Sequence, residues 1–386
     1  MNKKLIRTID KVQILNIYLV STLDYPIISK ILFALSVFIF IFLLINNLSV
    51  SKTAALYILA VASMFSFLLL DSMLRGNEWN SASKFIIPLF TLFNIYIYAA
   101  LSKEYGMQRY IFHYMVVSVL ISLKILLIFF LFANHILYDY LPIADSELNQ
   151  STWIALNSDG IRIFVGQATL IPIGILFYHY LYGKIPYLLL LIALPALVLT
   201  QTTVLWVTYV VVLGYLINAQ FKSFYKYMYL LLAAISFLML GILNYDLIDS
   251  VYTEKMMYSA PVKFQQIDIA LSALEVNFFS GAGLGHLYTN GSNTIEVVFL
   301  QILSSTGVIG FVFYSYMLFY WSVVSFKYVK IDKVTKVLFF SYFSIVFASF
   351  SNPYLIGGNS GLFLIPIIAA RFLQLKRIQL NRFSSS

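Results

Sequence analysis

Long hydrophobic stretches alternate along the whole chain with short polar segments. A bilayer with a hydrocarbon core of about 30 Å is crossed by a helix of about 20 mostly apolar residues, so the pattern predicts membrane-spanning helices. The span 293–325 is long for one crossing and contains Ser304, Gly307 and Gly310, which predicts a kink or break there. Twelve candidate spans result: 12–27, 30–46, 54–71, 85–101, 110–134, 161–182, 185–200, 202–219, 227–243, 293–325, 337–351 and 360–375.

Two polar segments, 135–160 and 244–292, are longer than the rest. In the second, apolar residues at helical spacing predict an amphipathic helix over 264–278, lying on the membrane surface or capping the bundle. This face comprises Phe264, Ile267, Leu271, Leu274 and Phe278. With no soluble domain and no internal repeat, we expect one all-α polytopic membrane domain over 1–386, with a large, partly helical outer loop between the ninth and tenth spans.

The amino-acid composition is typical of a protein that lies mainly in the lipid bilayer. Hydrophobic residues make up 61% of the sequence and charged residues 11%, with a mean hydropathy of +0.87. Soluble domains are roughly 45–50% apolar and about 25% charged, so a soluble enzyme, a disordered protein and a nucleic-acid binder are excluded. The absence of cysteine excludes disulfides and thiol nucleophiles, and four scattered histidines argue against a metal site.

The distribution of charge predicts the orientation. With the amino terminus inside, the inner segments hold most of the 25 basic residues, and only the acids Asp10, Glu104 and Asp332 fall there. The bias supports twelve crossings with both ends in the cytoplasm. The basic start followed by an apolar run resembles a signal peptide, but no small-residue cleavage site follows, so we expect an uncleaved first helix.

Two basic residues lie where lipid or a cavity surrounds them. Arg162 opens the span 161–182 at the outer boundary, where its guanidinium forks onto a phosphate, snorkels to the interface, or pairs with Asp159. Lys124 lies near the middle of 110–134, where a lysine costs about 2.5–3.5 kcal/mol. It therefore faces a cavity or pairs with an acid of a neighbouring helix.

A glycine-dense turn at 281–286 ends the large loop. The backbone of Gly283 and Gly285 either approaches an anion, with His286 beside it as a base, or forms a tight turn that needs positive φ. Glu296 either activates a hydroxyl or is an acid favoured by the helix dipole. Lys263 either meets phosphate or is solvated.

The carboxyl-terminal third resembles the O-antigen polymerase and ligase superfamily. Residues 277–285 (NFFSGAGLG) are similar to its "P-x-x-G-x-G-x-G" stretch, and 300–310 (LQILSSTGVIG) to its "L-Q-I-L-x-x-x-G-x-x-G" helix. Asn352-Pro353, the segment 199–203 (LTQTT), and Arg162 with Gly166 stand where the family has corresponding motifs.

Departures from the pattern favour a polymerase over a ligase. Ligases show a His-Asn pair before the second motif, where this chain has Asn293-Thr294-Ile295-Glu296. The arginine of the family's Leu-Thr-x-Ser-Arg segment is replaced at Thr202-Thr203, and Lys263 stands where members often have an arginine.

The resemblance implies a transferase that lengthens surface polysaccharide on the periplasmic face of the bacterial inner membrane, with 135–160 and 244–292 as periplasmic loops. The donor is a glycan on undecaprenyl pyrophosphate, and the acceptor is a hydroxyl of a second lipid-linked repeat. No metal or other cofactor is implied. Candidate partners are a chain-length regulator and a flippase. Arg162, Lys263 and Lys124, with the backbone of Gly283 and Gly285, are expected at the pyrophosphate, and His286 or Glu296 at the acceptor proton. Alternatives are the ligase, a lipid-linked glycan flippase and a structural membrane protein.

Overall fold

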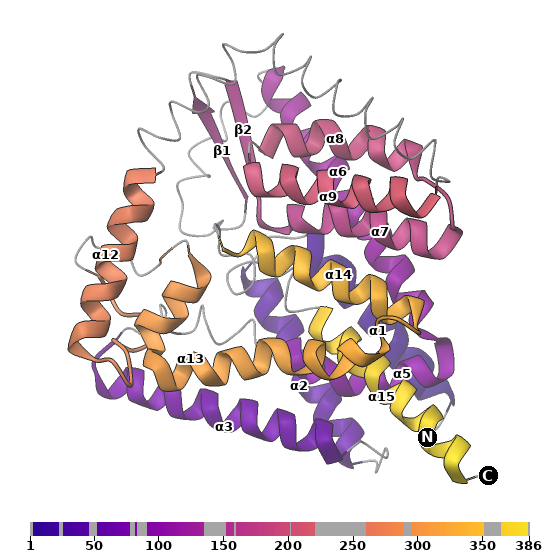
Figure 1. The fold of residues 1–386 in the computed structure, drawn as a ribbon, viewed down its shortest axis with the longest axis horizontal. Helices are drawn as coiled ribbons and strands as arrows, with labels where there is room; N and C mark the ends of the chain where they lie inside the picture. The colour runs from indigo at the N-terminus through magenta and orange to yellow at the C-terminus, as the bar shows by residue number, and fades with distance from the viewer. Residues whose placement is uncertain are drawn as a thin grey trace.

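The chain is mainly α-helical in the computed structural model, which describes residues 3–22, 26–45, 52–77, 82, 91–134, 152–157, 160–200, 202–220, 260–288, 295, 297–350 and 364–384. Figure 1 shows the helices packed into one body with both termini at the same end. The helices are α1 (Lys3–Thr22), α2 (Pro26–Ile45), α3 (Lys52–Leu74), α5 (Asn94–Tyr105), α6 (Met107–Ala133), α7 (Leu170–Tyr182), α8 (Tyr187–Thr200), α9 (Thr203–Gln220), α12 (Ala260–Val276), α13 (Val298–Ser325), α14 (Lys333–Ala348) and α15 (Leu364–Ser384).

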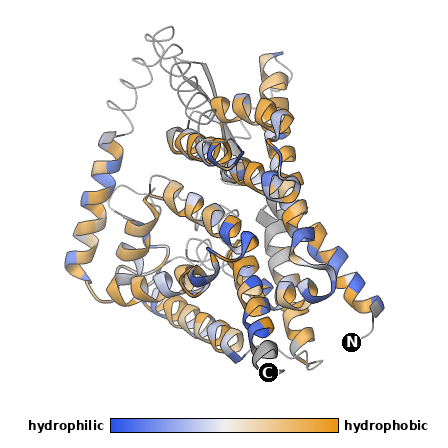
Figure 2. Cartoon of the chain, turned by 45° about the vertical axis from the view of Figure 1, so that its right-hand side comes forward, coloured by the Kyte–Doolittle hydropathy of each residue, from blue (hydrophilic) through white to orange (hydrophobic). Residues whose placement is uncertain are grey.

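The predicted helical class is confirmed in its coarse form. Every predicted span except 227–243 overlaps one of these helices, and 227–243 lies outside the described residues. Three described helices are long and apolar enough to cross a membrane: α3, α6, and α13 with its continuation to Tyr328. Shorter apolar helices run over Ala34–Leu43, Tyr187–Thr200 and Val204–Gln220, and Figure 2 shows that hydrophobic residues predominate along many of the helices. This is the character of an α-helical membrane protein.

The all-α prediction is corrected at one place, where β1 (Thr152–Asn157) and β2 (Gly160–Val165) form an antiparallel hairpin. The span predicted over 161–182 therefore starts as a strand and becomes α7 only at Leu170, after a 3-10 turn, η3 (Gly166–Thr169). β-branched Ile161, Ile163 and Val165 alternate along β2, a period that favours a strand over a helix. α7 alone is only about 20 Å long.

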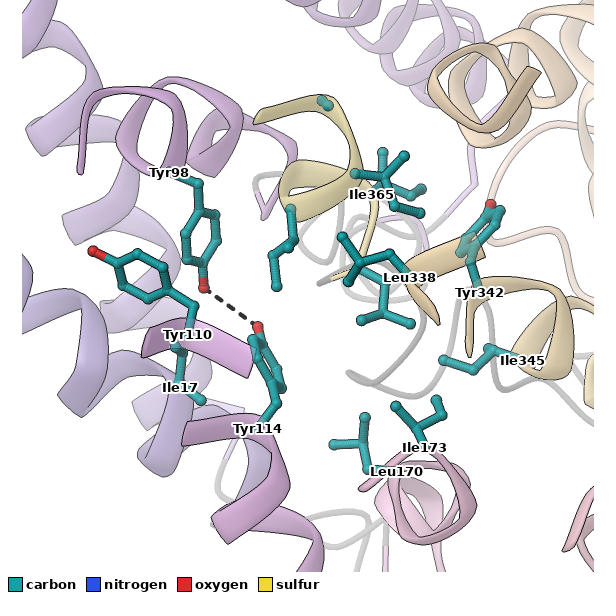
Figure 3. Close-up of a cluster of buried hydrophobic side chains, with 14 of the residues drawn as sticks. Ile17, Tyr98, Tyr110, Tyr114, Leu170, Ile173, Leu338, Tyr342, Ile345 and Ile365 are labelled. Carbon is teal, nitrogen blue, oxygen red and sulfur yellow. Dashed lines mark hydrogen bonds between the residues drawn. The ribbon is translucent and has the colours of Figure 1, made fainter. Parts of the chain in front are cut away.

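The core joins helices from both halves of the chain. α6 packs against α1, α7 and α8, and α15 packs against α5, α13 and α14. Figure 3 shows Tyr98 of α5 and Tyr114 of α6 turned toward each other, with their hydroxyls 3.3 Å apart. Leu338 and Tyr342 of α14 lie in the same buried cluster.

The helix predicted in the large outer loop is confirmed as α12, but its predicted apolar face is only partly buried. Phe264 and Leu271 are 67% and 48% exposed, whereas Gln266, Ala270 and Leu274 are buried. α12 packs on α13, because the small side chain of Ala270 allows close contact there. Among the described residues, α12 therefore packs on α13 and leaves both polar and apolar side chains exposed on its outer face.

Candidate functional site at a break in α13

Helix α13 is interrupted at Gly307, as the glycine and serine cluster predicted. Gly307 has φ 63° and ψ −172°, a conformation that is not helical. A continuous helix would carry bonds from the Val308 and Ile309 N–H groups to the Ser304 and Ser305 carbonyls. The break leaves these four backbone groups to be satisfied from elsewhere.

Residues 278–283, here called the strap, satisfy all four groups. The N–H groups of Ala282 and Gly283 donate to the Ser304 and Ser305 carbonyls at 2.9 and 2.8 Å. In return, the N–H groups of Val308 and Ile309 donate to the carbonyls of Phe278 and Phe279 at 3.0 and 3.3 Å. The strap thus takes the place of one turn of helix.

Two glycines allow the strap to approach so closely. A Cβ atom on Gly307 would overlap the Phe279 carbonyl, and one on Gly281 would overlap the Gly307 nitrogen. Gly281, Gly283 and Gly285 all have positive φ, between 67° and 91°. The tight-turn role is therefore observed, and the N–H of Gly283 is engaged by Ser305 rather than directed at an anion.

The end of α3 holds the strap from the other side. Arg75 donates from Nη1 to the Gly281 carbonyl at 2.9 Å and from Nη2 to the Ser280 hydroxyl at 2.7 Å. Its Nε donates to Asp71 at 2.9 Å. Asn77 donates to the Ala282 carbonyl at 3.2 Å, and the buried Ser72 hydroxyl donates to the Leu284 carbonyl.

A buried polar network lies beneath the turn. The hydroxyl of Tyr288 lies 2.7 Å from that of Ser304 and 3.2 Å from that of Ser305. Gln301 donates to the Ser305 hydroxyl at 2.8 Å and accepts from the Ile295 N–H. These side chains are almost fully buried, so the network fixes the first half of α13 against the segment that follows the turn.

His286 closes the turn and is half-buried. Its backbone N–H donates to the Gly283 carbonyl at 3.4 Å, and its ring meets Tyr288 edge to face, with centroids 5.2 Å apart. Burial lowers the pKa of His286 from its usual 6.5. The imidazole is therefore neutral at pH 7 and has the protonation state of a general base.

The length of α13 places the turn relative to a bilayer. Residues 308–325 after the break form about 27 Å of helix, close to the hydrocarbon thickness of about 30 Å. If this part crosses the membrane, the break, the strap and the end of α3 lie at its boundary. The Arg75 cation, which follows α3, and the neutral imidazole of His286, which follows the strap, then both lie at headgroup level.

The other predicted site residues lie on separate elements. Arg162 is in β2, opposite Ala155, and β2 packs on α6 and α8. Lys124 is a partly buried residue in the second half of α6, and Lys263 is a partly buried residue in the first turn of α12. Glu296 lies outside the described residues. No cluster of three or more His, Asp or Glu side chains suited to a metal occurs in the described part of the chain.

Sequence reasoning missed Arg75 and Tyr288 as parts of the site. Arg75 follows α3 directly, so an arginine immediately after an apolar span was the signal available. Neither a protein-family model nor a curated protein matches this chain.

Proposed function

We propose that this chain is a surface-polysaccharide polymerase of the O-antigen type, a glycosyltransferase of the bacterial inner membrane. In this proposal the chain crosses the membrane twelve times, with both ends in the cytoplasm and 135–160 and 244–292 as periplasmic loops. The observation that carries the proposal is the glycine turn seated in the broken α13, because the two motifs that resemble the polymerase and ligase superfamily are the two that bind each other here.

The reaction joins two lipid-linked glycans. An acceptor hydroxyl at the non-reducing end of a new repeat attacks the anomeric carbon of the growing glycan. The bond from that carbon to undecaprenyl pyrophosphate breaks, and pyrophosphate leaves with the electron pair. The acceptor proton passes to His286 or Glu296, and the neutral state of His286 supports the first.

Cations are needed because charge accumulates on the departing pyrophosphate. Arg162, Lys263 and Lys124 are the proposed partners of this charge. The Gly283 N–H is already bonded to the Ser305 carbonyl and does not bind pyrophosphate in this arrangement. In the proposal, Gly283 and Gly285 therefore serve to shape the turn that carries His286. A chain-length regulator and a flippase are the proposed partner proteins.

The decisive experiment supplies purified protein in lipid nanodiscs with lipid-linked repeat units alone. A polymerase produces a ladder of glycans that differ by one repeat, without any lipid A core. A product only after core acceptor is added would identify the ligase. Unchanged repeats that move across the bilayer would identify a flippase.

A further inference from the structure

Arg75 holds the strap through acceptors that carry no charge. The Arg75 guanidinium donates two hydrogen bonds to the strap, to the Gly281 carbonyl and the Ser280 hydroxyl, and one to Asp71. The Arg75 side chain is 27% exposed, so its guanidinium is within reach of a ligand at the membrane boundary. A guanidinium binds phosphate with two parallel, charge-assisted hydrogen bonds, in which donor and acceptor carry opposite charges. A phosphate offers the same fork geometry together with negative charge.

The strap and α13 have a second way to satisfy the same backbone groups. With the strap seated, the Ser304 and Ser305 carbonyls are bonded to Ala282 and Gly283. Without it, these carbonyls can accept from Val308 and Ile309 one turn along, once Gly307 takes a helical φ. In either arrangement, strap-bound or closed helix, these four backbone groups of α13 have hydrogen-bond partners. The segment can therefore switch between two states.

We infer that the strap is detachable, that Arg75 is its latch, and that a lipid-linked diphosphate releases it by taking the Arg75 guanidinium. Release lets α13 close its helix and frees the turn that carries His286. This inference rests on the proposed function for the identity of the lipid. Arg75 is then a positioning residue: when the diphosphate headgroup binds its guanidinium, the turn that carries His286 is released.

Hydrogen–deuterium exchange of the full-length protein in nanodiscs tests the latch. In the unliganded protein, the amides of Ala282, Gly283, Val308 and Ile309 should be protected. Arg75→Gln removes two strap bonds, so exchange at Ala282 and Gly283 should become about 10–100-fold faster. Arg109→Gln is the matched control, because Arg109 pairs with Asp10 on α1 and its loss should leave the strap amides unchanged.

The ligand arms use inorganic pyrophosphate and nanodiscs that contain a polyprenyl diphosphate. Either diphosphate should speed exchange at Ala282 and Gly283 in the parent protein and have no further effect in Arg75→Gln, while Val308 and Ile309 stay protected because the helix has closed. If the polyprenyl diphosphate speeds exchange at a lower concentration than inorganic pyrophosphate does, the result supports a lipid-linked ligand. A response to inorganic pyrophosphate alone overturns that part.

Equal exchange in Arg75→Gln and the parent protein would overturn the latch. So would loss of protection at Val308 and Ile309 when the strap leaves, because α13 would then have frayed rather than closed. If Arg75→Gln fails to fold, the ligand arms on the parent protein decide alone. A responsive strap in a protein that makes no glycan ladder rejects only the proposed function, and a silent strap in an active polymerase rejects only the latch.

Discussion

Arg371 of α15 grips both carboxylate oxygens of Asp332, with Nε 3.0 Å from Oδ2 and Nη2 2.6 Å from Oδ1. The same Oδ2 accepts from the backbone N–H and the hydroxyl of Thr335, at 2.8 and 2.7 Å, and so caps α14. Asp10 is paired in a similar way, with Arg109 at 2.9 Å. Two of the three acids predicted on the cytoplasmic side are therefore neutralised by arginines.

Removing the charge of Asp332 should destabilise the protein. Asp332→Asn leaves Arg371 partly buried without its counter-ion, and we expect a loss of about 3 kcal/mol. Thermal unfolding of the solubilised protein, followed by tryptophan fluorescence, measures the loss. Lys330→Gln, an exposed change two residues earlier, should fall within about 0.5 kcal/mol of the parent. Indistinguishable unfolding of all three proteins would refute the prediction.

The contribution of Asp332 should depend on pH. Burial raises the pKa of Asp332, but hydrogen bonds from Arg371 and Thr335, with the charge of Arg371, outweigh burial and hold the pKa below 3.8. A carboxyl with a lowered folded pKa stabilises the fold above its unfolded value and loses this effect as pH falls through the folded value. The gap in unfolding temperature between the parent and Asp332→Asn should be constant above about pH 4 and shrink below it. A gap that persists into strong acid would contradict this.

The break in α13 should tolerate only glycine. Gly307→Ala places a Cβ atom on the Phe279 carbonyl and forces a side chain into backbone space that is essentially restricted to glycine. The unfavourable backbone conformation of an alanine at this position alone lowers the free energy of unfolding by about 1–3 kcal/mol. Gly214→Ala is the matched control, because nothing lies within 4 Å of its added Cβ in α9, and it should be neutral or stabilising by up to about 1 kcal/mol. Equal unfolding temperatures for the two variants would argue against a seated strap.

Protonation of His286 should cause the rate of the proposed polymerisation to fall at low pH, a fall here called the acid limb. Burial lowers its pKa below 6.5, so the imidazole stays neutral at pH 7 and becomes protonated only at lower pH. We expect the rate to fall below pH 6.5, and His286→Gln to lower it about 10²–10⁴-fold and remove that limb. The assay is ladder formation from lipid-linked repeats over a range of pH. His179→Gln in α7 is the control. A retained limb in His286→Gln would assign the base to another group, with Glu296 the next candidate.

Arg162 should act on chain length. If its guanidinium meets pyrophosphate in the transition state, Arg162→Ala slows turnover by about 10²–10³-fold. Electrophoresis of the surface glycan should then show single repeats in place of long chains. Arg377→Gln, an exposed change near the end of α15, should leave long chains intact. Normal chain length in Arg162→Ala would remove Arg162 from the mechanism.

The hydrophobic pattern predicted most helices, because a membrane span is defined by its own composition. It failed at Ile161, Ile163 and Val165, where an apolar run was assigned to a helix although its period was that of a strand. It also misplaced the packed face of α12, since side-chain size at Ala270 outweighed hydrophobicity at Phe264.

The site was only half visible in the sequence. The glycines of 281–285 and Gly307 were recognised as two separate motifs, and the predicted break in α13 is confirmed. The two motifs bind each other through backbone bonds between residues 22 to 30 positions apart, and Arg75 binds one of them through side-chain bonds across 205 and 206 positions. Such pairing has no local periodicity, so no window of the sequence reveals it.

The order of synthesis gives the strap a further meaning. Phe278 and Phe279 are synthesised before Val308 and Ile309, so a nascent chain that ends before Val308 lacks the two N–H groups of α13 that donate to the carbonyls of Phe278 and Phe279. The full set of four backbone bonds between the strap and α13 can therefore form only once Ile309 has been synthesised. A polypeptide arrested before that point would keep the glycine turn but would leave the Phe278 and Phe279 carbonyls without their donors from α13.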